Sequence, residues 1–217
     1  MNIYWYGQSF FKIEGDKSVL VIDPFDNSFG LKLPRLSADV VTVSHDHSDH
    51  NNVDSIKGIG DDDPFVITSP GEYEVKGIFI QGMAAFHDDK EGSEQGENII
   101  YRYDIDGISL AHLGDLGHSL TDHQLEKLEG VDILFIPVGG GSTIDAKKAT
   151  EVISQLEPRI VIPMHYSLPG LKTKTKLDDL NAFCKEIGVC PKEKINKYKI
   201  TKKDLPQDNL QIIVLEP

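Results

Sequence analysis

Short apolar runs and turn signals in the first half of the chain predict antiparallel strands. Apolar and β-branched residues over 3–13 and 18–22 predict a hairpin that turns around Glu14-Gly15-Asp16. The run over 98–103 predicts a strand that pairs with 108–111 across a two-residue turn. These patterns indicate sheets in which neighbouring strands are joined by tight turns.

The second half of the chain alternates between strands and helices. Two strand-like apolar runs, 133–138 and 159–164, alternate with three segments of helical periodicity, 120–128, 145–156 and 177–187. Antiparallel hairpins combined with this alternation predict a mixed α/β fold.

The chain shows no linker or low-complexity stretch between these segments. Its glycine-rich and acidic patches, 58–63 and 88–96, are typical of surface loops. A chain of 217 residues can bury an adequate core of its own. We therefore expect a single domain over residues 1–217.

Four of the apolar runs end on residues that bind metals. The run 40–43 leads into the cluster His45-Asp46-His47-Ser48-Asp49-His50, and the other three lead to His87, to His112 and Asp115, and to His165. Imidazole nitrogens and carboxylate oxygens are donors that divalent transition metals prefer. Loops at strand ends often carry the chemistry of a fold, so four such ends at one edge predict one shared metal pocket.

The spacing within the cluster is compatible with two ions. Residues two apart in an extended segment point the same way, so His45 and His47 can bind one ion together. If the chain then enters a helical turn, Asp49 and His50 point in another direction and can hold a second ion. The alternative is a solvated acidic loop, and the donors that recur downstream favour the metal site.

The cluster has the form His-x-His-x-Asp-His, and through it the chain resembles the metallo-β-lactamase superfamily. The resemblance runs from about Tyr4 to Tyr166, and Pro163-Met164-His165-Tyr166 is similar to the branch that contains ascorbate-6-phosphate lactonase. This chain is shorter than that lactonase and lacks its long insertions, so the fold is carried over more readily than the substrate. The resemblance implies a four-layer αβ/βα sandwich with mixed sheets and with metals at one edge.

The same resemblance implies the ligands and the chemistry. In that family's order, His87 is the third histidine of the first site, Asp115 the bridging carboxylate and His165 the last ligand of the second site. The implied ligand set is His45, His47, Asp49, His50, His87, Asp115 and His165. Two divalent ions, zinc by preference with manganese or iron as alternatives, would lower the pKa of a bound water and so supply a nucleophile for hydrolysis.

Asp49, His118 and Tyr166 are the candidate catalytic residues. His118 lies three residues beyond Asp115 and is a candidate for substrate contact or proton transfer, with loop packing as the alternative. Tyr166, directly after His165, could donate a hydrogen bond to substrate.

The sequence allows more than one interpretation of several further polar residues. Asp23 resembles the family's strand-end aspartate, which supports the histidine loop, and a turn cap is its alternative. His112 is expected behind the ligands rather than among them. Glu72 and Glu74 could face the pocket together or remain at the surface, and the loop Gly139-Gly140-Gly141 could receive an anion or pack tightly near the metals.

Composition narrows the setting of the protein. No apolar run approaches the roughly 18 residues of a membrane span, and hydrophobic residues make up 39% of the chain. The sequence Met1-Asn2-Ile3-Tyr4 enters strand-like residues without the features of a secretory signal, so we expect a cytoplasmic protein. The two cysteines, Cys184 and Cys190, are expected as ordinary thiols, with a single bridge as the alternative.

The net charge of −13 opposes binding to nucleic acid or an acidic membrane. Ten of the 22 basic residues lie between Lys172 and Lys203, where Phe183 and Tyr198 are the only aromatic residues, which favours a solvated surface over a nucleic-acid platform. Two divalent ions on Asp49 and Asp115 would leave about two positive charges, which suits an anionic small-molecule substrate. Homo-oligomers are compatible with the sequence.

The leading hypothesis is a metal-dependent hydrolase that acts on a small ester- or lactone-like or phosphate-containing substrate. The alternative is a non-hydrolytic metal protein on the same fold, either an iron redox site or a metabolite-binding sensor. The chain carries no flavin-binding segment to supply electrons, which favours hydrolysis.

Overall fold

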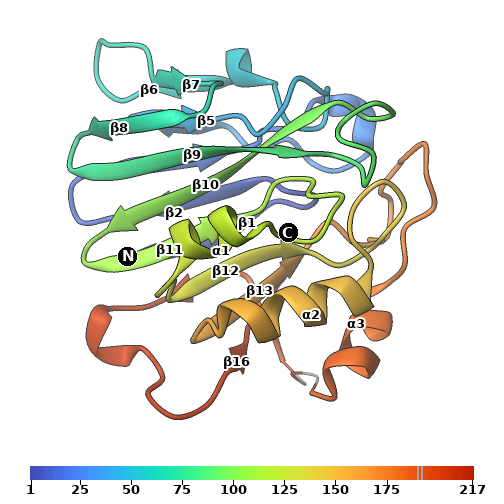
Figure 1. Cartoon of the computed structure of the whole chain (residues 1–217). Helices are drawn as coiled ribbons and strands as arrows, with labels where there is room; N and C mark the ends of the chain where they lie inside the picture. Colours follow the sequence, from blue (N-terminus) through green and yellow to red (C-terminus); the bar gives the residue numbers. More distant parts are fainter. Residues whose placement is uncertain (190, 192) are drawn as a thin grey trace.

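Two mixed β-sheets form the body of the molecule (Figure 1). The computed structural model describes residues 1–189, 191 and 193–217. The first sheet has six strands, which are in spatial order β15 (Tyr198–Lys199), β1 (Asn2–Trp5), β2 (Phe11–Glu14), β3 (Val19–Ile22), β5 (Val40–Thr42) and β7 (Phe65–Ile67). The second has seven, which are β16 (Gln211–Ile212), β13 (Ile160–Met164), β12 (Ile133–Pro137), β11 (Ile108–His112), β10 (Glu97–Ile105), β9 (Ile78–Phe86) and β8 (Gly71–Val75).

The two sheets are built on a similar plan. In the first, the antiparallel strands β1, β2 and β3 are followed by β5 and β7, which run parallel to β3. In the second, the antiparallel strands β9, β10 and β11 are followed by β12 and β13, which run parallel to β11. Two short ladders complete the structure, β4 (Leu36–Ala38) with β6 (Ile56–Gly58) and β14 (Lys194–Ile195) with β17 (Val214–Leu215).

The main core lies between the two sheets. Phe11 of β2 packs on Phe135 of β12 with ring centroids 4.6 Å apart, so side chains from both sheets meet there. Strand residues alternate between faces, which places Leu20 in this core and its neighbour Val21 in a smaller one. The smaller core lies on the outer face of the first sheet, where Phe25 and other apolar residues cover it.

In the part of the chain that the structure describes, three α-helices lie on the side of the second sheet. The helices α1 (Asp122–Leu128) and α2 (Ala146–Leu156) cover its outer face, and α3 (Leu180–Ile187) packs against α2 (Figure 1). Each begins after a polar side chain that accepts hydrogen bonds from the backbone of its first turn, Thr121, Asp145 and Asp179 respectively.

The layer over the first sheet contains 3₁₀ helices and loops. Its described helical segments are η1 (Asn27–Phe29) and η2 (Val53–Ser55), and a third, η3 (Lys202–Asp204), lies near the end of the chain. The predicted α/β sandwich with mixed sheets is therefore confirmed, with short 3₁₀ turns where the outermost layer faces the first sheet.

The predicted strand over 3–13 is wrong as a single element. The chain forms two antiparallel strands, β1 and β2, because Gly7 adopts a φ of 105° and Phe10 donates a backbone hydrogen bond to the Gly7 carbonyl. The other hairpin is confirmed, and its strands pair up to the turn, where Ile105 lies opposite Ile108. The third helix begins at Leu180 rather than 177, because Asp179 caps it.

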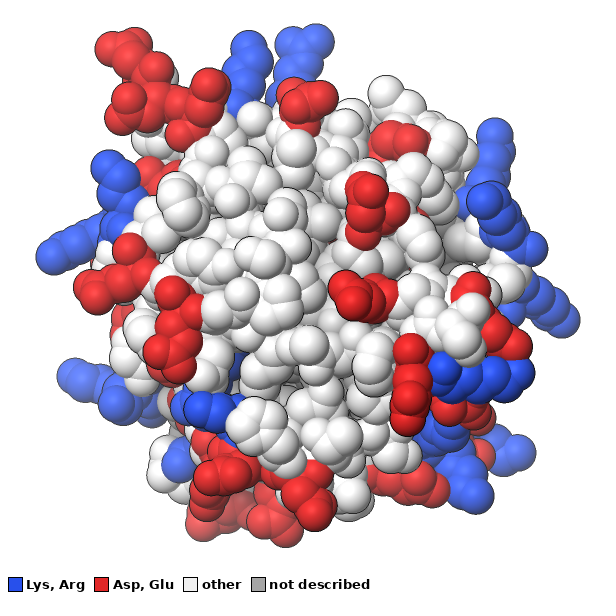
Figure 2. All heavy atoms as spheres, turned by 45° about the horizontal axis from the view of Figure 1, so that its top comes forward, with Lys and Arg blue, Asp and Glu red and all other residues white. Residues whose placement is uncertain are grey.

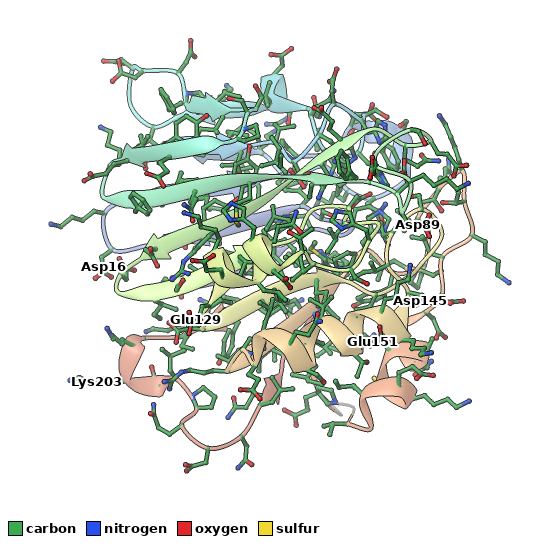
Figure 3. The ribbon with its side chains drawn as sticks, viewed as in Figure 1. Asp16, Asp89, Glu129, Asp145, Glu151 and Lys203 are labelled. Atoms are coloured by element: carbon green, nitrogen blue, oxygen red, sulfur yellow. The ribbon has the colours of Figure 1, made fainter. Side chains whose placement is uncertain are left out.

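Most charged side chains lie at the surface of the molecule, with Asp23 and Asp115 among the buried exceptions. Asp16 and Lys203 point outwards in Figure 3, and Glu129 is exposed. On the face that Figure 2 shows, Lys and Arg lie mainly towards the margin among Asp and Glu.

Among the described residues, no helix has the length and apolar content to cross a membrane. Cys184 on α3 is disulfide-bonded, which corrects the expectation of ordinary thiols, while Cys190 lies outside the described residues.

Two buried tyrosines of β10 connect the sheets just before the histidine cluster. The hydroxyl of Tyr103 forms a 2.8 Å hydrogen bond with Thr42 Oγ1 on β5, and the hydroxyl of Tyr101 donates to the Val43 carbonyl over 3.0 Å. These contacts fix the end of β5, from which the cluster starts, against the opposite sheet.

We predict that Tyr103→Phe lowers the free energy of unfolding by about 1–3 kcal/mol, because it leaves the buried Thr42 hydroxyl without its partner. Urea denaturation monitored by circular dichroism measures the change. Tyr73→Phe is the control, since the hydroxyl of Tyr73 bonds to Ser69 at the surface. Equal effects of both substitutions would contradict a bridging role for Tyr103.

Candidate metal centre

The donors predicted from the sequence follow strands whose carboxyl ends share one edge of the sandwich. In the first sheet β3 and β5 run parallel, and they lead to Asp23 and to the His45–His50 cluster. In the second sheet β9, β11 and β13 run in the same direction and lead to His87, Asp115 and His165. The predicted convergence of these strand ends is what the structure shows.

The seven predicted ligands form two groups. One consists of His45, His47 and His87, and the other of Asp49, His50, Asp115 and His165. Within each group the candidate ligand atoms all lie within 4.8 Å of one another. This division matches the two sites expected from the spacing of the cluster. The cluster forms a turn, in which His50 and Asn51 donate to the His47 carbonyl, rather than a helix.

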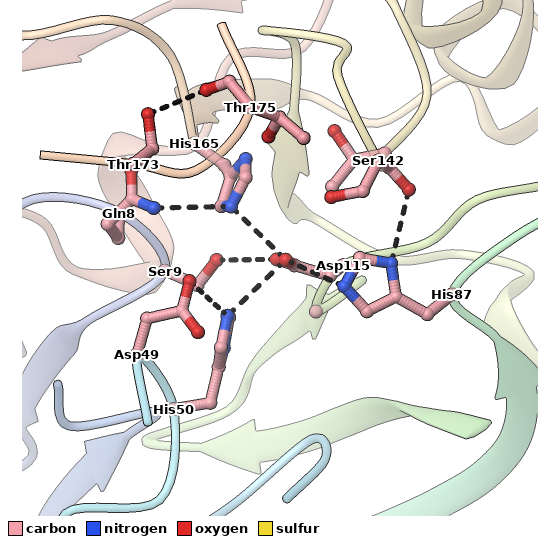
Figure 4. A network of polar contacts seen from close by, with 12 residues as sticks. Gln8, Ser9, Asp49, His50, His87, Asp115, Ser142, His165, Thr173 and Thr175 are labelled. Carbon is pink, nitrogen blue, oxygen red and sulfur yellow. Dashed lines mark hydrogen bonds and ion pairs between the residues drawn. The ribbon is translucent and has the colours of Figure 1, made fainter. Parts of the chain in front are cut away.

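Asp115 lies between the two groups (Figure 4). Its Oδ2 atom is 3.3 Å from His87 Nε2, 3.3 Å from His50 Nε2 and 3.1 Å from His165 Nε2. The Ser9 hydroxyl donates to its other oxygen over 3.2 Å. One carboxylate therefore contacts imidazoles of both groups, which is the position a bridging ligand needs.

Gly114 allows the backbone to bring Asp115 into this place. Its φ is 55°, and a Cβ atom there would lie 2.3 Å from Asn98 Oδ1. That oxygen accepts the backbone N–H of Asp115 over 3.0 Å, and the amide of Asn98 donates to the Leu113 carbonyl. A larger residue at 114 would disturb the contact that orients the carboxylate.

Hydrogen bonds on the far side of three rings direct their Nε2 atoms into the site. The Nδ1 atoms of His45, His50 and His87 contact Ser44 Oγ, Asp23 Oδ2 and the Ser142 carbonyl at 2.9, 2.9 and 3.1 Å. In the described part of the chain, the buried Nε2 atom of His45 has no hydrogen-bond partner, and the Nε2 atoms of His50 and His87 face the carboxylate of Asp115. Imidazoles held through Nδ1, with Nε2 directed towards the other donors, suit metal coordination.

Asp23 organises the start of the cluster. It accepts hydrogen bonds from the backbone and hydroxyl of Ser44, each over 2.7 Å, in addition to its contact with His50. Asp23 is fully buried and has a φ of 48°, a conformation that residues with side chains rarely adopt. The contacts agree with the supporting role that the resemblance implied for Asp23.

The charges of the cluster favour a bound cation. Burial lowers the pKa of His45 to about 2, and it also lowers the pKa of His47. Burial acts the same way on His50 and His87, but Asp115, Asp49 and Asp23 together raise the pKa of His50, and Asp115 raises that of His87. Burial raises the pKa of Asp115, yet His165 and His50 hold it well below its usual range. The ionised carboxylate therefore favours protons on the rings of His50 and His87, and a metal ion would replace them.

A cavity of about 430 Å³ opens beside the donors. Its walls include Gln8, Asp49, His87, Asp115 and His165, and the loop residues Thr173, Lys174 and Thr175 form one side. A second cavity of about 550 Å³ lies on the His45 side and shares Asp46, His47 and Gln95 with the first. Both are within the size range of small-molecule sites.

His118 and Tyr166 lie outside both cavity walls. The Phe86 backbone donates to His118 Nε2 over 3.1 Å, and His118 Nδ1 contacts the Ser119 carbonyl at 2.7 Å. Both ring nitrogens are thus engaged by backbone, which favours the loop-packing alternative. Tyr166 is buried, with its ring 5.2 Å from Trp5, and burial raises the pKa of its hydroxyl. Its contacts are those of a core residue.

The remaining sequence candidates also have defined places. His112 is buried, with Nε2 3.1 Å from the Ser9 carbonyl, so it supports the site from behind as expected. Glu72 and Glu74 are exposed on β8. The loop 139–141 packs closely, since a Cβ at Gly139 would lie 2.3 Å from the His165 carbonyl.

Sequence reasoning missed Gln8, Ser9, Asn98 and Ser142, which contact the predicted donors. A signal existed for Gln8 and Ser9, because they follow the strand β1, which runs in the same direction as β3 and ends at the same edge. The contact of Ser142 uses only its backbone carbonyl, which no residue type reveals.

Comparisons with known proteins are consistent with this geometry. A family model for the beta-lactamase superfamily domain matches residues 2–165. Relatives include a UPF0173 metal-dependent hydrolase of Thermoplasma volcanium, 30% identical over 77% of this chain and 84% of its own, and another of Thermococcus onnurineus, 29% identical over 77% and 85%. A solved structure of a candidate Zn-dependent hydrolase of the metallo-β-lactamase superfamily from Thermotoga maritima is 32% identical, covers 99% of each chain and has a TM-score of 0.75.

We predict that Asp23→Asn weakens zinc binding by about 10- to 100-fold, because an amide nitrogen in place of Oδ2 no longer accepts from His50 Nδ1. Competition with a fluorescent zinc chelator measures the affinity. Asp26→Asn is the matched control, since Asp26 caps η1 at the surface and an amide oxygen can still accept from Ser28. Unchanged zinc affinity in Asp23→Asn would contradict this role.

A second prediction concerns the loop 88–96, which carries Gln95 into both cavities. The Asp88 carboxylate accepts four backbone N–H groups, those of Lys90, Gly92, Glu94 and Gln95. These bonds, that of Gln95 foremost, lower the pKa of Asp88 to about 2. Because its pKa is lowered, ionised Asp88 stabilises the folded loop when the pH is above the ordinary pKa of an aspartate. This contribution is lost as the pH falls towards 2.

We therefore expect acid to open this loop in the parent protein, and Asp88→Asn to open it at pH 7. An amide retains one acceptor oxygen, so exchange of two of the four backbone amides should become several-fold faster in hydrogen-exchange NMR. Asp89→Asn, at the exposed neighbouring position, is the control. Equal exchange rates in both variants would refute the assigned role of Asp88.

Proposed function

This chain belongs to the metallo-β-lactamase superfamily of metal-dependent hydrolases, and we propose that it uses two divalent ions to activate water against a small ester, lactone or phosphate-containing substrate. The supporting observation is the arrangement of the seven donors in two compact groups with the Asp115 carboxylate between them. The narrower kinship with the lactonase branch stays a prediction.

The donor set fits divalent transition metals. Five imidazoles and two carboxylates converge there. In the described part of the chain, rings of both groups have buried nitrogens without a hydrogen-bond partner. We propose zinc as the native metal, since nitrogen-rich sites with carboxylates are typical of it, whereas manganese and iron accept the same donors. Bound there, two ions would lower the pKa of a water and polarise a substrate oxygen.

The protein's own residues would position the reaction. Asp115 contacts rings of both groups and so keeps the two groups together. Asp23 and Ser44 hold the histidine rings of the cluster from the side that faces away from the site. The side chain of Asp49 is 19% exposed against 2% for Asp115, so we assign to Asp49 both metal binding and orientation of the attacking water. His118 and Tyr166, with their buried or backbone contacts, receive no catalytic role in this proposal.

The cavity suits a small and anionic substrate. Its volume of about 430 Å³ holds a small molecule. Two divalent ions bring four positive charges, which Asp49 and Asp115 reduce to about two. The other charged side chains in the wall, Asp46 and Lys174, offset one another. A net positive site attracts a carboxylate or a phosphate.

We predict that the purified protein binds two zinc ions per chain and that chelation abolishes hydrolysis of a panel of lactones, esters and phosphodiesters. Elemental analysis and single-turnover assays before and after chelation test both statements. His47→Ala removes one donor of the first group and Asp49→Ala one of the second, so each should reduce the zinc content to about one ion per chain.

His123→Ala is the control, because His123 is exposed on α1. It should retain both ions and full activity. Hydrolysis that persists in fully metal-depleted protein would refute the proposal, as would two zinc ions retained by both ligand variants. Iron as the sole metal, with no hydrolysis, would favour the non-hydrolytic alternative.

A further inference from the structure

Gln8 is a fully buried carboxamide at the metal centre to which the proposed function assigns no role. It lies after the carboxyl end of β1 and lines the cavity together with His165 and Asp115. Figure 4 shows its amide directed towards His165. A polar side chain without any exposed surface normally forms hydrogen bonds within the protein.

The amide of Gln8 is short of such partners. In the described part of the chain its Oε1 atom has none. Its Nε2 atom lies 3.3 Å from His165 Nε2, the same ring nitrogen that lies 3.1 Å from Asp115 Oδ2. A metal ion bound by this nitrogen would take its lone pair, so the nitrogen could no longer accept a hydrogen bond from Gln8. Metal binding therefore removes the one side-chain contact recorded for the amide among the described residues.

The backbone holds Gln8 in this orientation. Its φ is 49°, a left-handed conformation that non-glycine residues seldom adopt and that is concentrated at functional sites. Its carbonyl accepts the indole N–H of Trp5 over 2.9 Å and the backbone N–H of His165 over 3.2 Å. The strand end of β13 thus fixes the turn that carries the amide.

A buried amide without a partner is unfavourable, and a molecule that enters the cavity can supply one. We propose that Gln8 is a substrate-binding catalytic residue whose Nε2 group donates a hydrogen bond to a negatively charged substrate oxygen beside the second donor group. This inference rests on the proposed function. It gives the site a directional contact for a carboxylate, a phosphate or the oxyanion that develops during hydrolysis.

Inorganic phosphate is a suitable probe, and calorimetric titration into the zinc-loaded full chain measures its affinity. Gln8→Met keeps the approximate volume and removes both polar ends. It should retain two zinc ions with unchanged zinc affinity but bind phosphate about tenfold more weakly or worse. Gln8→Glu should bind phosphate more weakly still, since its carboxylate repels the anion. The control Gln81→Met removes an exposed amide of β9 that bonds to Glu72 and should leave phosphate affinity unchanged.

The outcomes separate this inference from the proposed function. Parent-like phosphate affinity in Gln8→Met, with both zinc ions bound, would overturn the inference alone. Loss of zinc from Gln8→Met would also overturn it, because Gln8 would then support the metal and not the substrate. If Gln8→Met fails to fold, Gln8→Glu decides, and phosphate affinity equal to that of the parent overturns the inference. A parent protein that binds no zinc would overturn both.

Discussion

The site depends on one buried negative charge. Asp115 is almost fully buried, and its carboxylate remains ionised because the rings of His50, His87 and His165 surround one of its oxygens. An isolated carboxylate at such depth would be strongly unfavourable, and paired charges of this kind contribute little net stability. The arrangement is therefore better explained by function than by folding, because it forces the surrounding imidazoles to converge on a point where a cation can replace their protons.

Convergence of this kind requires strand ends from both sheets at one edge. Parallel strands supply it, since β3 and β5 of the first sheet and β11, β12 and β13 of the second each deliver their carboxyl ends to a common side. The tyrosines of β10 then fix the end of β5 against the opposite sheet. The strand ends of the sandwich thus hold both donor groups in place, and preorganisation of this type is what a catalytic site needs.

The sequence revealed those parts of the site that residue chemistry encodes. Histidines and aspartates after apolar runs predicted the donors, and their spacing predicted the division between His45 and His47 on one side and Asp49 and His50 on the other. The hairpin of β10 and β11 and the helices were also predictable, because periodicity and turn residues report local structure. The break between β1 and β2 was not, since one left-handed glycine, Gly7, interrupts an otherwise continuous apolar pattern.

The sequence could not reveal which polar side-chain atoms lack a hydrogen-bond partner once the backbone hydrogen bonds of the fold have formed. His118 is a reasonable proton donor by position, yet two backbone groups engage its ring, whereas Gln8 attracts no notice as a residue type and holds an amide with an unpaired buried oxygen in the described structure. The difference lies in backbone conformation. Gln8, Asp23 and His165 each follow a strand and adopt a φ near 50°, which turns the chain sharply. Such strain persists only where surrounding contacts impose it. Gln8 and His165 line the cavity, and Asp23 holds the ring of His50 behind it, so the sharp turns place all three side chains at the site.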